Sequence, residues 1–283
     1  MKTSWIHRSI EVELTRVCNE YPVVTITGPR QSGKTSLVKR YCKGYSYANL
    51  ELPEVRHLAN SDPRAFFNAY PAPVIIDEVQ RQPELLSYIQ VFADETDKRG
   101  QYILTGSHQL DLAAAISQSL AGRTALLRLL PLSLSELKNA GIEMSRDELL
   151  FKGFMPRLYS EEIRPSALYS EYFKNYIERD LRQLISIRDL LLFEKFLRVL
   201  AGRIGQVINI TSLSSDVGVS RTTLNEWLSV LEASFVVFRL PSWFDNANKR
   251  AIKTPKLYFT ETGLAAWLLE IETPKQISRD PLL

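Results

Sequence analysis

The stretch Pro22–Tyr41 reads PVVTITGPRQSGKTSLVKRY and holds an apolar run, a loop bounded by two glycines and a Lys-Thr pair. Residues Val23 to Ile26 are apolar and mostly β-branched, which predicts a short buried strand. The residues SLVKRY after the loop predict a helix. A strand, a glycine loop and a helix in this order are typical of a parallel α/β sheet.

The loop from Gly28 to Thr35 matches the P-loop pattern G-x-x-x-x-G-K-[ST] at every required position. Glycines at its ends allow several backbone N–H groups to turn toward a phosphate, and the helix beginning at Lys34 adds its positive end. Lys34 would contact the outer phosphates of a nucleotide triphosphate, and the Thr35 hydroxyl would ligate Mg²⁺. The alternative is a chance match in a glycine-containing turn. The predicted nucleotide-binding residues are Gly28, Pro29, Arg30, Gln31, Ser32, Gly33, Lys34, Thr35 and Ser36.

A pair of acids, Asp77 and Glu78, follows a second apolar run, PVII. Asp77 would hold Mg²⁺ through water, and Glu78 would polarise the attacking water. Such a pair favours an ATPase over a small-molecule kinase, because an activated water serves hydrolysis and not the transfer of phosphate to a small molecule. The alternative is that both acids cap the next helix. The sequence contains no Asn-Lys-x-Asp segment for reading guanine, so ATP is a better prediction than GTP.

A third predicted strand, Gln101–Leu104, ends in Thr105-Gly106-Ser107. If this strand lies next to the first, a hydroxyl of Thr105 or Ser107 would sit beside the γ-phosphate as a sensor. A lone histidine follows at His108, and the more ordinary interpretation is a loop residue.

Residues Leu112–Leu120 predict a helix that ends at Ala121-Gly122-Arg123, before an apolar strand from Ala125 to Leu130. An arginine at such a junction can face the nucleotide of a neighbouring subunit and act as an arginine finger. A solvated surface arginine is the alternative, and the sequence leaves both open for Arg123.

From about Arg146 the pattern changes to long helices, as in SALYSEYFKNYIERDLRQLI and LLLFEKFLRVLAGRIG. The turn Lys152–Arg157 lies at this change. It is a candidate for covering the adenine or sensing the phosphate, and a plain interdomain turn is the alternative.

Residues Asn209–Leu228 predict a helix-turn-helix with a turn at Gly218 and a cap at Ser220, and Phe235–Leu240 would be the first strand of a wing. In a DNA reader the second helix would offer side chains to a major groove and later basic residues would meet phosphate. A packing or protein-contact module is the alternative, since nearby acids dilute the charge. The candidate DNA-contacting residues are Arg221, Thr222, Thr223, Asn225, Lys249, Arg250, Lys253 and Lys256.

The chain has 283 residues, of which 45% are hydrophobic and 24% charged, and these values are typical of a globular protein. Its formal charge of +3 is too small to imply nucleic-acid binding by itself. Two isolated cysteines, Cys18 and Cys42, suit a reducing cytosol. No signal peptide or membrane span is predicted, so we expect a cytoplasmic protein.

Several segments taken in order resemble one family: GPRQSGKTSL, VIIDEVQ, LTGSHQL, SLAGR with LLPLSLSEL, YIERDLR and KTPKLYFTETGLA. They are similar to the bacterial and archaeal AAA+-type ATPases that join a P-loop domain to a winged helix and a nuclease-like C-terminal domain of unknown function. The resemblance covers nearly the whole chain. It departs at Glu261, where the family commonly has aspartate, and at Gly153-Phe154-Met155-Pro156, where a Gly-Gly-aromatic-Pro turn is common.

We therefore expect an α/β P-loop NTPase domain over residues 1–145, a helical linker or lid over 146–205, a winged helix over 206–260 and the start of a truncated C-terminal domain over 261–283. Three functions follow in order of preference. The first is Mg²⁺-dependent ATP hydrolysis coupled to the winged helix, the second a slow nucleotide-gated switch, and the third a DNA-binding regulator whose affinity ATP tunes. A homo-oligomer or a protein partner is compatible with each.

Overall fold

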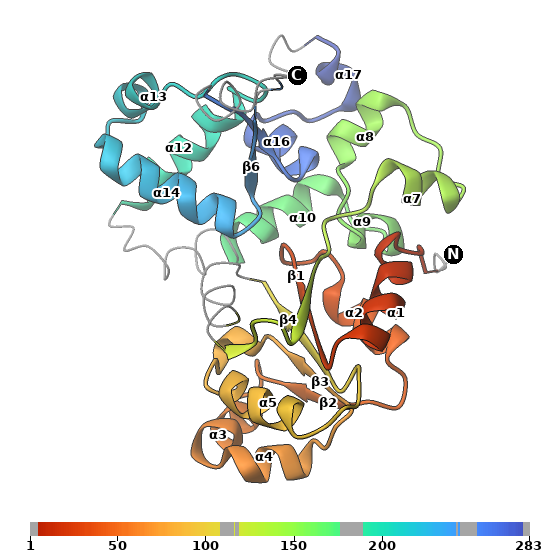
Figure 1. Cartoon of the computed structure of the whole chain (residues 1–283). Helices are drawn as coiled ribbons and strands as arrows, with labels where there is room; N and C mark the ends of the chain where they lie inside the picture. Colours follow the sequence, from red (N-terminus) through yellow and green to blue (C-terminus); the bar gives the residue numbers. More distant parts are fainter. Residues whose placement is uncertain are drawn as a thin grey trace. The chain divides into compact units, whose positions relative to one another are not determined.

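The computed structural model describes residues 5–107, 116, 119–175, 189–241, 243 and 254–279. The chain divides into an N-terminal unit, Ile6–Leu130, and a C-terminal unit that begins at Pro131 and includes the first residues of the chain (Figure 1). Among the described helices, none combines the length and the apolarity that crossing a membrane requires.

The N-terminal unit is built on a five-stranded parallel sheet with the order β2-β3-β4-β1-β5. Its three central strands are buried along their whole length, as expected for a parallel sheet with both faces covered. Strand β4 pairs with β1, so the third predicted strand lies next to the first, which is the arrangement that the sensor role of Thr105 or Ser107 requires. The strands are β1 Val23–Thr27, β2 Ser46–Asn49, β3 Val74–Asp77, β4 Tyr102–Gly106 and β5 Thr124–Arg128.

Helices connect these strands and carry the core of the unit. Helix α2 packs against β3 and β4, and α1 packs against β1 and β5. One apolar cluster joins the strands to α3, α4 and α5, with Phe66, Leu85 and Leu104 completely buried in it. The helices are α1 Ile10–Glu20, α2 Lys34–Tyr41, α3 Pro53–Ser61, α4 Pro63–Ala69, the 3₁₀ helix η1 Val79–Arg81 and α5 Leu85–Asp94.

Two predictions in this unit fall wholly or mostly outside the described residues. They are the loop position of His108 and the helix over 112–120, of which Ile116, Ser119 and Leu120 are described. The strand predicted from Ala125 is present as β5.

The C-terminal unit is mainly helical, as the change of pattern near Arg146 predicts. Its short antiparallel sheet pairs β6 Val237–Leu240 with β7 Lys256–Phe259. The helices are α7 Leu134–Asn139, α8 Arg146–Lys152, α9 Arg157–Ser160, α10 Pro165–Tyr172, α12 Leu190–Ala201, α13 Ile210–Val217, α14 Arg221–Ala233, α16 Thr262–Leu268 and α17 Pro274–Ile277.

The predicted helix-turn-helix segment consists of α13, a turn and α14 (Figure 1). Gly218 ends α13 in left-handed backbone, and the Ser220 side chain accepts a hydrogen bond from the Thr223 amide at the start of α14. Trp227 of α14 packs edge-on against Phe193 of α12 with ring centres 5.1 Å apart. The assignment of this segment as a winged helix stays a prediction.

The segments predicted as a helical linker, a winged helix and the start of a further domain lie in one compact unit, and their assignment as separate domains stays a prediction. The unit begins at Pro131, before the predicted boundary at residue 145. Helices α16 and α17 pack against α8, and α16 also packs against α10 and α12. Residues from Glu261 onward therefore belong to the same compact unit as the helical segment that starts at Arg146.

A buried carboxylate joins the two positions that depart from the resembled family. Glu261 Oε1 accepts hydrogen bonds from the Phe154 amide at 2.8 Å, the Tyr169 hydroxyl at 2.9 Å and the Gly263 amide at 3.2 Å. A Cβ atom on Gly153 would lie 2.0 Å from Glu261 Oε1, so glycine is required for this approach. The turn that the sequence offers as an adenine or phosphate sensor thus has a packing partner inside its own unit.

Burial raises the pKa of Glu261 from 4.5 to about 7, although its three hydrogen bonds favour the charged form. Between these values the folded unit holds a proton that the unfolded chain has released. The free energy of unfolding should therefore fall as the pH rises through this window.

We expect the C-terminal unit to lose on the order of 3 kcal/mol of stability between pH 4.5 and 7. Glu261→Gln should flatten this slope, because an amide mimics the protonated acid and keeps the accepting oxygen. Urea unfolding followed by tryptophan fluorescence tests this, since Trp5, Trp227, Trp243 and Trp267 all belong to this unit.

The exposed Glu162→Gln is the matched control and should leave the slope as it is in the natural protein. A slope that Glu261→Gln leaves unchanged would show that another group titrates.

Candidate functional site

The P-loop joins the carboxyl end of β1 to the first turn of α2. Gly33 and Gln31 have left-handed backbone with φ angles of 94° and 62°. A Cβ atom on Gly28 would lie 2.0 Å from the Leu129 carbonyl oxygen, so the loop passes directly against the residue that follows β5. Both glycines of the motif are therefore required by geometry, and Gln31 holds a conformation that costs a non-glycine residue free energy.

The Lys34 side chain folds back over the loop. Its Nζ donates to the carbonyl oxygens of Gly28 and Pro29, at 2.9 Å each, and the side chain is buried. Burial lowers the pKa of Lys34 to about 8, while Glu78 and Asp77 act in the opposite direction. The loop therefore carries a cation that desolvation has made easier to deprotonate.

Two further polar groups complete the interior of the loop. The Ser32 side chain is completely buried, and its hydroxyl has no hydrogen-bond partner among the described residues. Arg8, from the segment before α1, donates to the Ser32 carbonyl oxygen at 2.8 Å and to the Leu130 carbonyl oxygen at 2.6 Å. Sequence reasoning missed Arg8, because nothing near it in the chain marks it as a partner of the loop.

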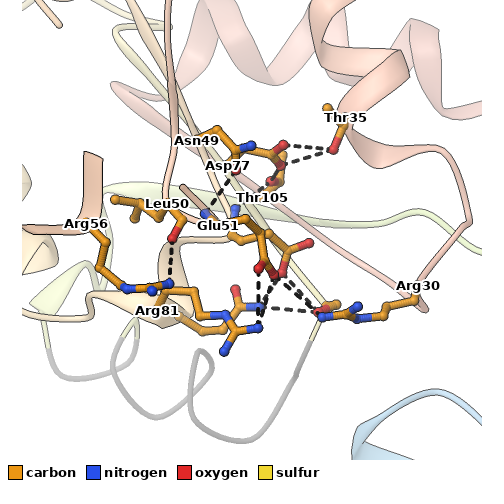
Figure 2. Close-up of polar contacts among 12 residues, drawn as sticks. Arg30, Thr35, Asn49, Leu50, Glu51, Arg56, Asp77, Arg81 and Thr105 are labelled. Atoms are coloured by element: carbon orange, nitrogen blue, oxygen red, sulfur yellow. Dashed lines mark hydrogen bonds and ion pairs between the residues drawn. The ribbon is translucent and has the colours of Figure 1, made fainter. Parts of the chain in front are cut away.

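Asp77 at the end of β3 accepts hydrogen bonds from three hydroxyl groups. Thr35 of the P-loop helix donates at 2.9 Å, Tyr47 of β2 at 2.7 Å, and Thr105 of β4 through a short contact. Figure 2 shows Thr35 and Thr105 beside the carboxylate. Three neighbouring elements thus meet at one acid, and Tyr47 is the member that sequence reasoning missed.

The role of Tyr47 becomes visible only once the order of the strands in the sheet is known. It is the second residue of β2 and pairs with Ile75 of β3, so its ring lies beside the strand that ends in Asp77. Burial and the hydrogen bond to Asp77 raise the pKa of Tyr47 well above its ordinary value. The hydroxyl therefore remains a proton donor to the carboxylate at neutral pH.

Glu78 lies beside Asp77 in a strained backbone conformation, with a φ angle of 58°. Its amide donates to the Thr105 hydroxyl at 3.2 Å, and its carboxylate accepts from the Ser107 hydroxyl at 3.1 Å and from the Gln80 amide. Helix η1 follows without a side-chain cap. Both acids are therefore held by groups at the strand ends, and the alternative in which they cap the next helix is not observed.

A charged cluster lies at the same edge of the sheet. Glu51, which follows β2, contacts Arg81 Nη2 at 3.1 Å and Arg30 Nη2 at 3.5 Å. Figure 2 shows both arginines directed at the Glu51 carboxylate. Sequence reasoning placed Arg30 in the loop but gave no sign of Glu51 or Arg81, because their meeting depends on the turn after β2.

The predicted site residues therefore fall into groups that lie in different parts of the fold. The P-loop from Gly28 to Ser36 and the strand-end residues Asp77, Glu78, Thr105 and Ser107 come together at the carboxyl edge of the parallel sheet, the usual position of ligand sites in such folds. Thr105 and Ser107 both contact an acid of this pair. Their role as sensors of the γ-phosphate stays a prediction.

Arg123 lies at the amino ends of the strands, whereas the P-loop leaves the sheet at their carboxyl ends. It precedes β5, its carbonyl oxygen accepts from the Val23 amide at the start of β1, and its guanidinium pairs with Asp94 at 2.6 and 2.8 Å. Because the P-loop follows the other end of β1, Arg123 does not reach the P-loop of its own chain. An action on a neighbouring subunit stays a prediction.

The predicted DNA-contacting residues belong to the C-terminal unit. Arg221, Thr222 and Asn225 are exposed at the start of α14, and Thr223 is half-buried. Lys256 is exposed on β7. The remaining candidates, Lys249, Arg250 and Lys253, lie outside the described residues.

Comparison with known families identifies both halves of the chain. Residues 20–138 match the model of an AAA domain, and residues 143–275 match the model of a domain of unknown function (DUF8612). An AAA P-loop domain implies nucleotide binding.

Two curated relatives are similar over 279 residues at 30% identity: the uncharacterised proteins Rv2008c of Mycobacterium tuberculosis and Mb2031c of Mycobacterium bovis. The match covers 98% of this chain but 62% of each relative, so the chain spans less than two thirds of their length.

The solved structure of the Walker-type ATPase paby2304 of Pyrococcus abyssi has the same fold, with a TM-score of 0.57 at 15% identity over 93% of this chain and 96% of that chain. The chain thus carries an AAA domain of the P-loop class, followed by a domain of unknown function.

Proposed function

We propose that the N-terminal unit binds ATP with Mg²⁺ and hydrolyses it to ADP and phosphate. The observation that carries this proposal is the pair Asp77 and Glu78, held by Thr35, Thr105 and Ser107 at the sheet edge from which the P-loop leaves. An acid for a metal and an acid for water, next to a phosphate loop, are the parts that hydrolysis of a phosphoanhydride needs.

The residues present suit a nucleotide. The Lys34 ammonium contacts two loop carbonyls, and the phosphate oxygens of a ligand would offer it charged acceptors instead. The buried Ser32 hydroxyl is a further donor inside the loop.

The oxygen ligands of the site suit magnesium. The Thr35 hydroxyl and the Asp77 carboxylate are hard ligands, and Mg²⁺ is commonly held by one or two such groups together with substrate phosphates. The bound ion would neutralise charge on the β- and γ-phosphates. Thr35 and Asp77 would hold it, and Tyr47 would orient the carboxylate through its hydroxyl.

Glu78 takes the role of general base. Its carboxylate would accept the proton of the attacking water, while Ser107 and Gln80 fix its direction. The turnover rate decides between a working ATPase and a slow nucleotide-gated switch, since both use the same residues. In either case we propose that nucleotide state is coupled to the helix-turn-helix segment of the C-terminal unit.

DNA binding by the C-terminal unit is the second candidate function. The observation that favours it is the exposure of Arg221, Thr222 and Asn225 on the first turns of α14. Two ion pairs argue against a strongly basic surface on this unit, because Arg203 is paired with Asp216 and Arg239 with Glu232.

The nucleotide site is tested by two variants in equilibrium binding and phosphate-release assays. Lys34→Ala should weaken ATP binding strongly, because the loop loses its mobile cation. Glu78→Gln should bind ATP but release phosphate about 10²-fold more slowly, since a general base typically contributes 10²- to 10⁴-fold. The exposed Lys43→Ala is the control and should behave as the natural protein.

If Lys34→Ala binds ATP as tightly as the natural protein, the loop does not hold the phosphates. Undiminished turnover in Glu78→Gln would remove Glu78 from the mechanism.

The role of Tyr47 is tested by Tyr47→Phe, which removes only the hydroxyl that donates to Asp77. We expect nucleotide binding to require about tenfold more Mg²⁺, because groups that orient a metal ligand commonly contribute 10- to 100-fold to metal affinity. A magnesium titration of labelled-nucleotide binding measures this. Tyr70→Phe, which alters a ring packed on Phe66, is the matched control, and equal magnesium requirements in the two variants would contradict the assignment.

The DNA candidate is tested by duplex binding as a function of salt. Arg221→Ala should weaken binding at low salt and reduce the salt slope by about one if Arg221 contacts a phosphate. Arg279→Ala, an exposed arginine of the same unit, is the control. If the natural protein does not bind duplex at low salt, the segment is better explained as a packing or protein-contact module.

A further inference from the structure

Glu51 is shared by two arginines at the edge of the sheet from which the P-loop leaves. Arg81 Nη2 lies 3.1 Å from Glu51 Oε1 and 3.4 Å from Oε2, whereas Arg30 Nη2 lies 3.5 Å from Oε1. Arg30 belongs to the P-loop, and Arg81 ends the short helix that follows Glu78 (Figure 2). One carboxylate therefore links the phosphate loop to the segment of the proposed general base.

The position of Glu51 is fixed by its own turn. The Glu51 amide donates to the Asn49 side chain at 3.0 Å, and the Leu50 amide donates to the Asp77 carbonyl oxygen at 3.1 Å. Arg56 donates to the Leu50 carbonyl oxygen at 3.1 Å. These contacts tie the turn to β3, so the backbone that carries the Glu51 side chain is held in place.

The two contacts of Glu51 are unequal. Arg81 makes hydrogen bonds, and Arg30 makes a longer ion pair between partly exposed side chains, a kind of pair that contributes little by itself. Two guanidinium groups share one carboxylate, so Arg30 can leave while Arg81 continues to neutralise Glu51. The positive charge of Arg30 is also one of the causes that lower the pKa of Lys34, which places it within electrostatic reach of the loop's own cation.

We propose that Glu51 holds Arg30 as a competing anion, and that the phosphates of a bound nucleotide draw the Arg30 guanidinium away from Glu51 while Arg81 stays. This inference rests on the proposed nucleotide site. An arginine fork can contact two phosphate oxygens at once, and a triphosphate carries more charge than a diphosphate. The exchange therefore favours ATP over ADP and signals the nucleotide state to the segment that runs from Glu78 to Arg81.

The test uses the full chain and measures the affinities of a non-hydrolysable ATP analogue and of ADP by competition with a labelled nucleotide. Glu51→Gln should bind the analogue roughly three- to tenfold more tightly, with a smaller gain for ADP, because Glu51 no longer competes with the phosphates for Arg30. Arg30→Gln should bind the analogue more weakly, and Arg30→Lys should recover part of the loss. Glu51→Gln combined with Arg30→Gln should show no gain over Arg30→Gln alone.

Glu54→Gln is the matched control, because Glu54 is an exposed carboxylate three residues away with no ion pair or hydrogen bond among the described residues. It should leave both affinities unchanged. Thermal unfolding of each variant shows whether the fold is intact.

Four outcomes would overturn the inference. Weaker analogue binding in Glu51→Gln, with an intact fold, would mean that Glu51 supports the binding conformation of the loop instead of competing with the nucleotide. An equal gain with and without Arg30 would mean simple charge repulsion. Nucleotide binding that is absent, or indifferent to Lys34→Ala, would overturn the proposed function together with this inference, whereas Lys34-dependent binding without an effect of Glu51 overturns this inference alone.

Discussion

The insertion of β4 between β1 and β3 is the constraint on which the site depends. Parallel strands end at a common edge, so the P-loop after β1 and the acids after β3 flank the end of the strand between them. Thr105 on that central strand donates to Asp77 and accepts from the Glu78 amide. A single buried hydroxyl thus contacts the side chain of one acid and the strained backbone of the other.

The parts of the site that the sequence predicts are those whose chemistry is local. The glycines at 28 and 33, Lys34 and Thr35 lie in one loop, and Asp77 and Glu78 follow one apolar strand, so spacing along the chain is enough to identify them. These segments combine strand, turn and helix signals that agree with one another.

The parts that the sequence could not predict are contacts between distant segments. Arg8 reaches the loop from before α1, Tyr47 reaches Asp77 from the edge strand, and Glu51 meets Arg30 through a turn fixed by β3. Each is an ordinary residue type in an ordinary local pattern, and only the packing gives it a partner. The same is true of Glu261 and Phe154, whose departures from the resembled family look independent in the sequence and are in contact in the fold through the Phe154 amide.

Two hydrogen bonds of the Arg8 guanidinium have a mechanical consequence. One reaches the Ser32 carbonyl oxygen inside the P-loop, and the other reaches that of Leu130, the last residue of the N-terminal unit. The Leu129 carbonyl in turn leaves no space for a side chain on Gly28. Residues Leu129 and Leu130, where the chain leaves the N-terminal unit, are therefore in contact with the P-loop near both of its ends, Gly28 directly and Ser32 through Arg8. A force applied to the chain at this point would change the shape of the loop.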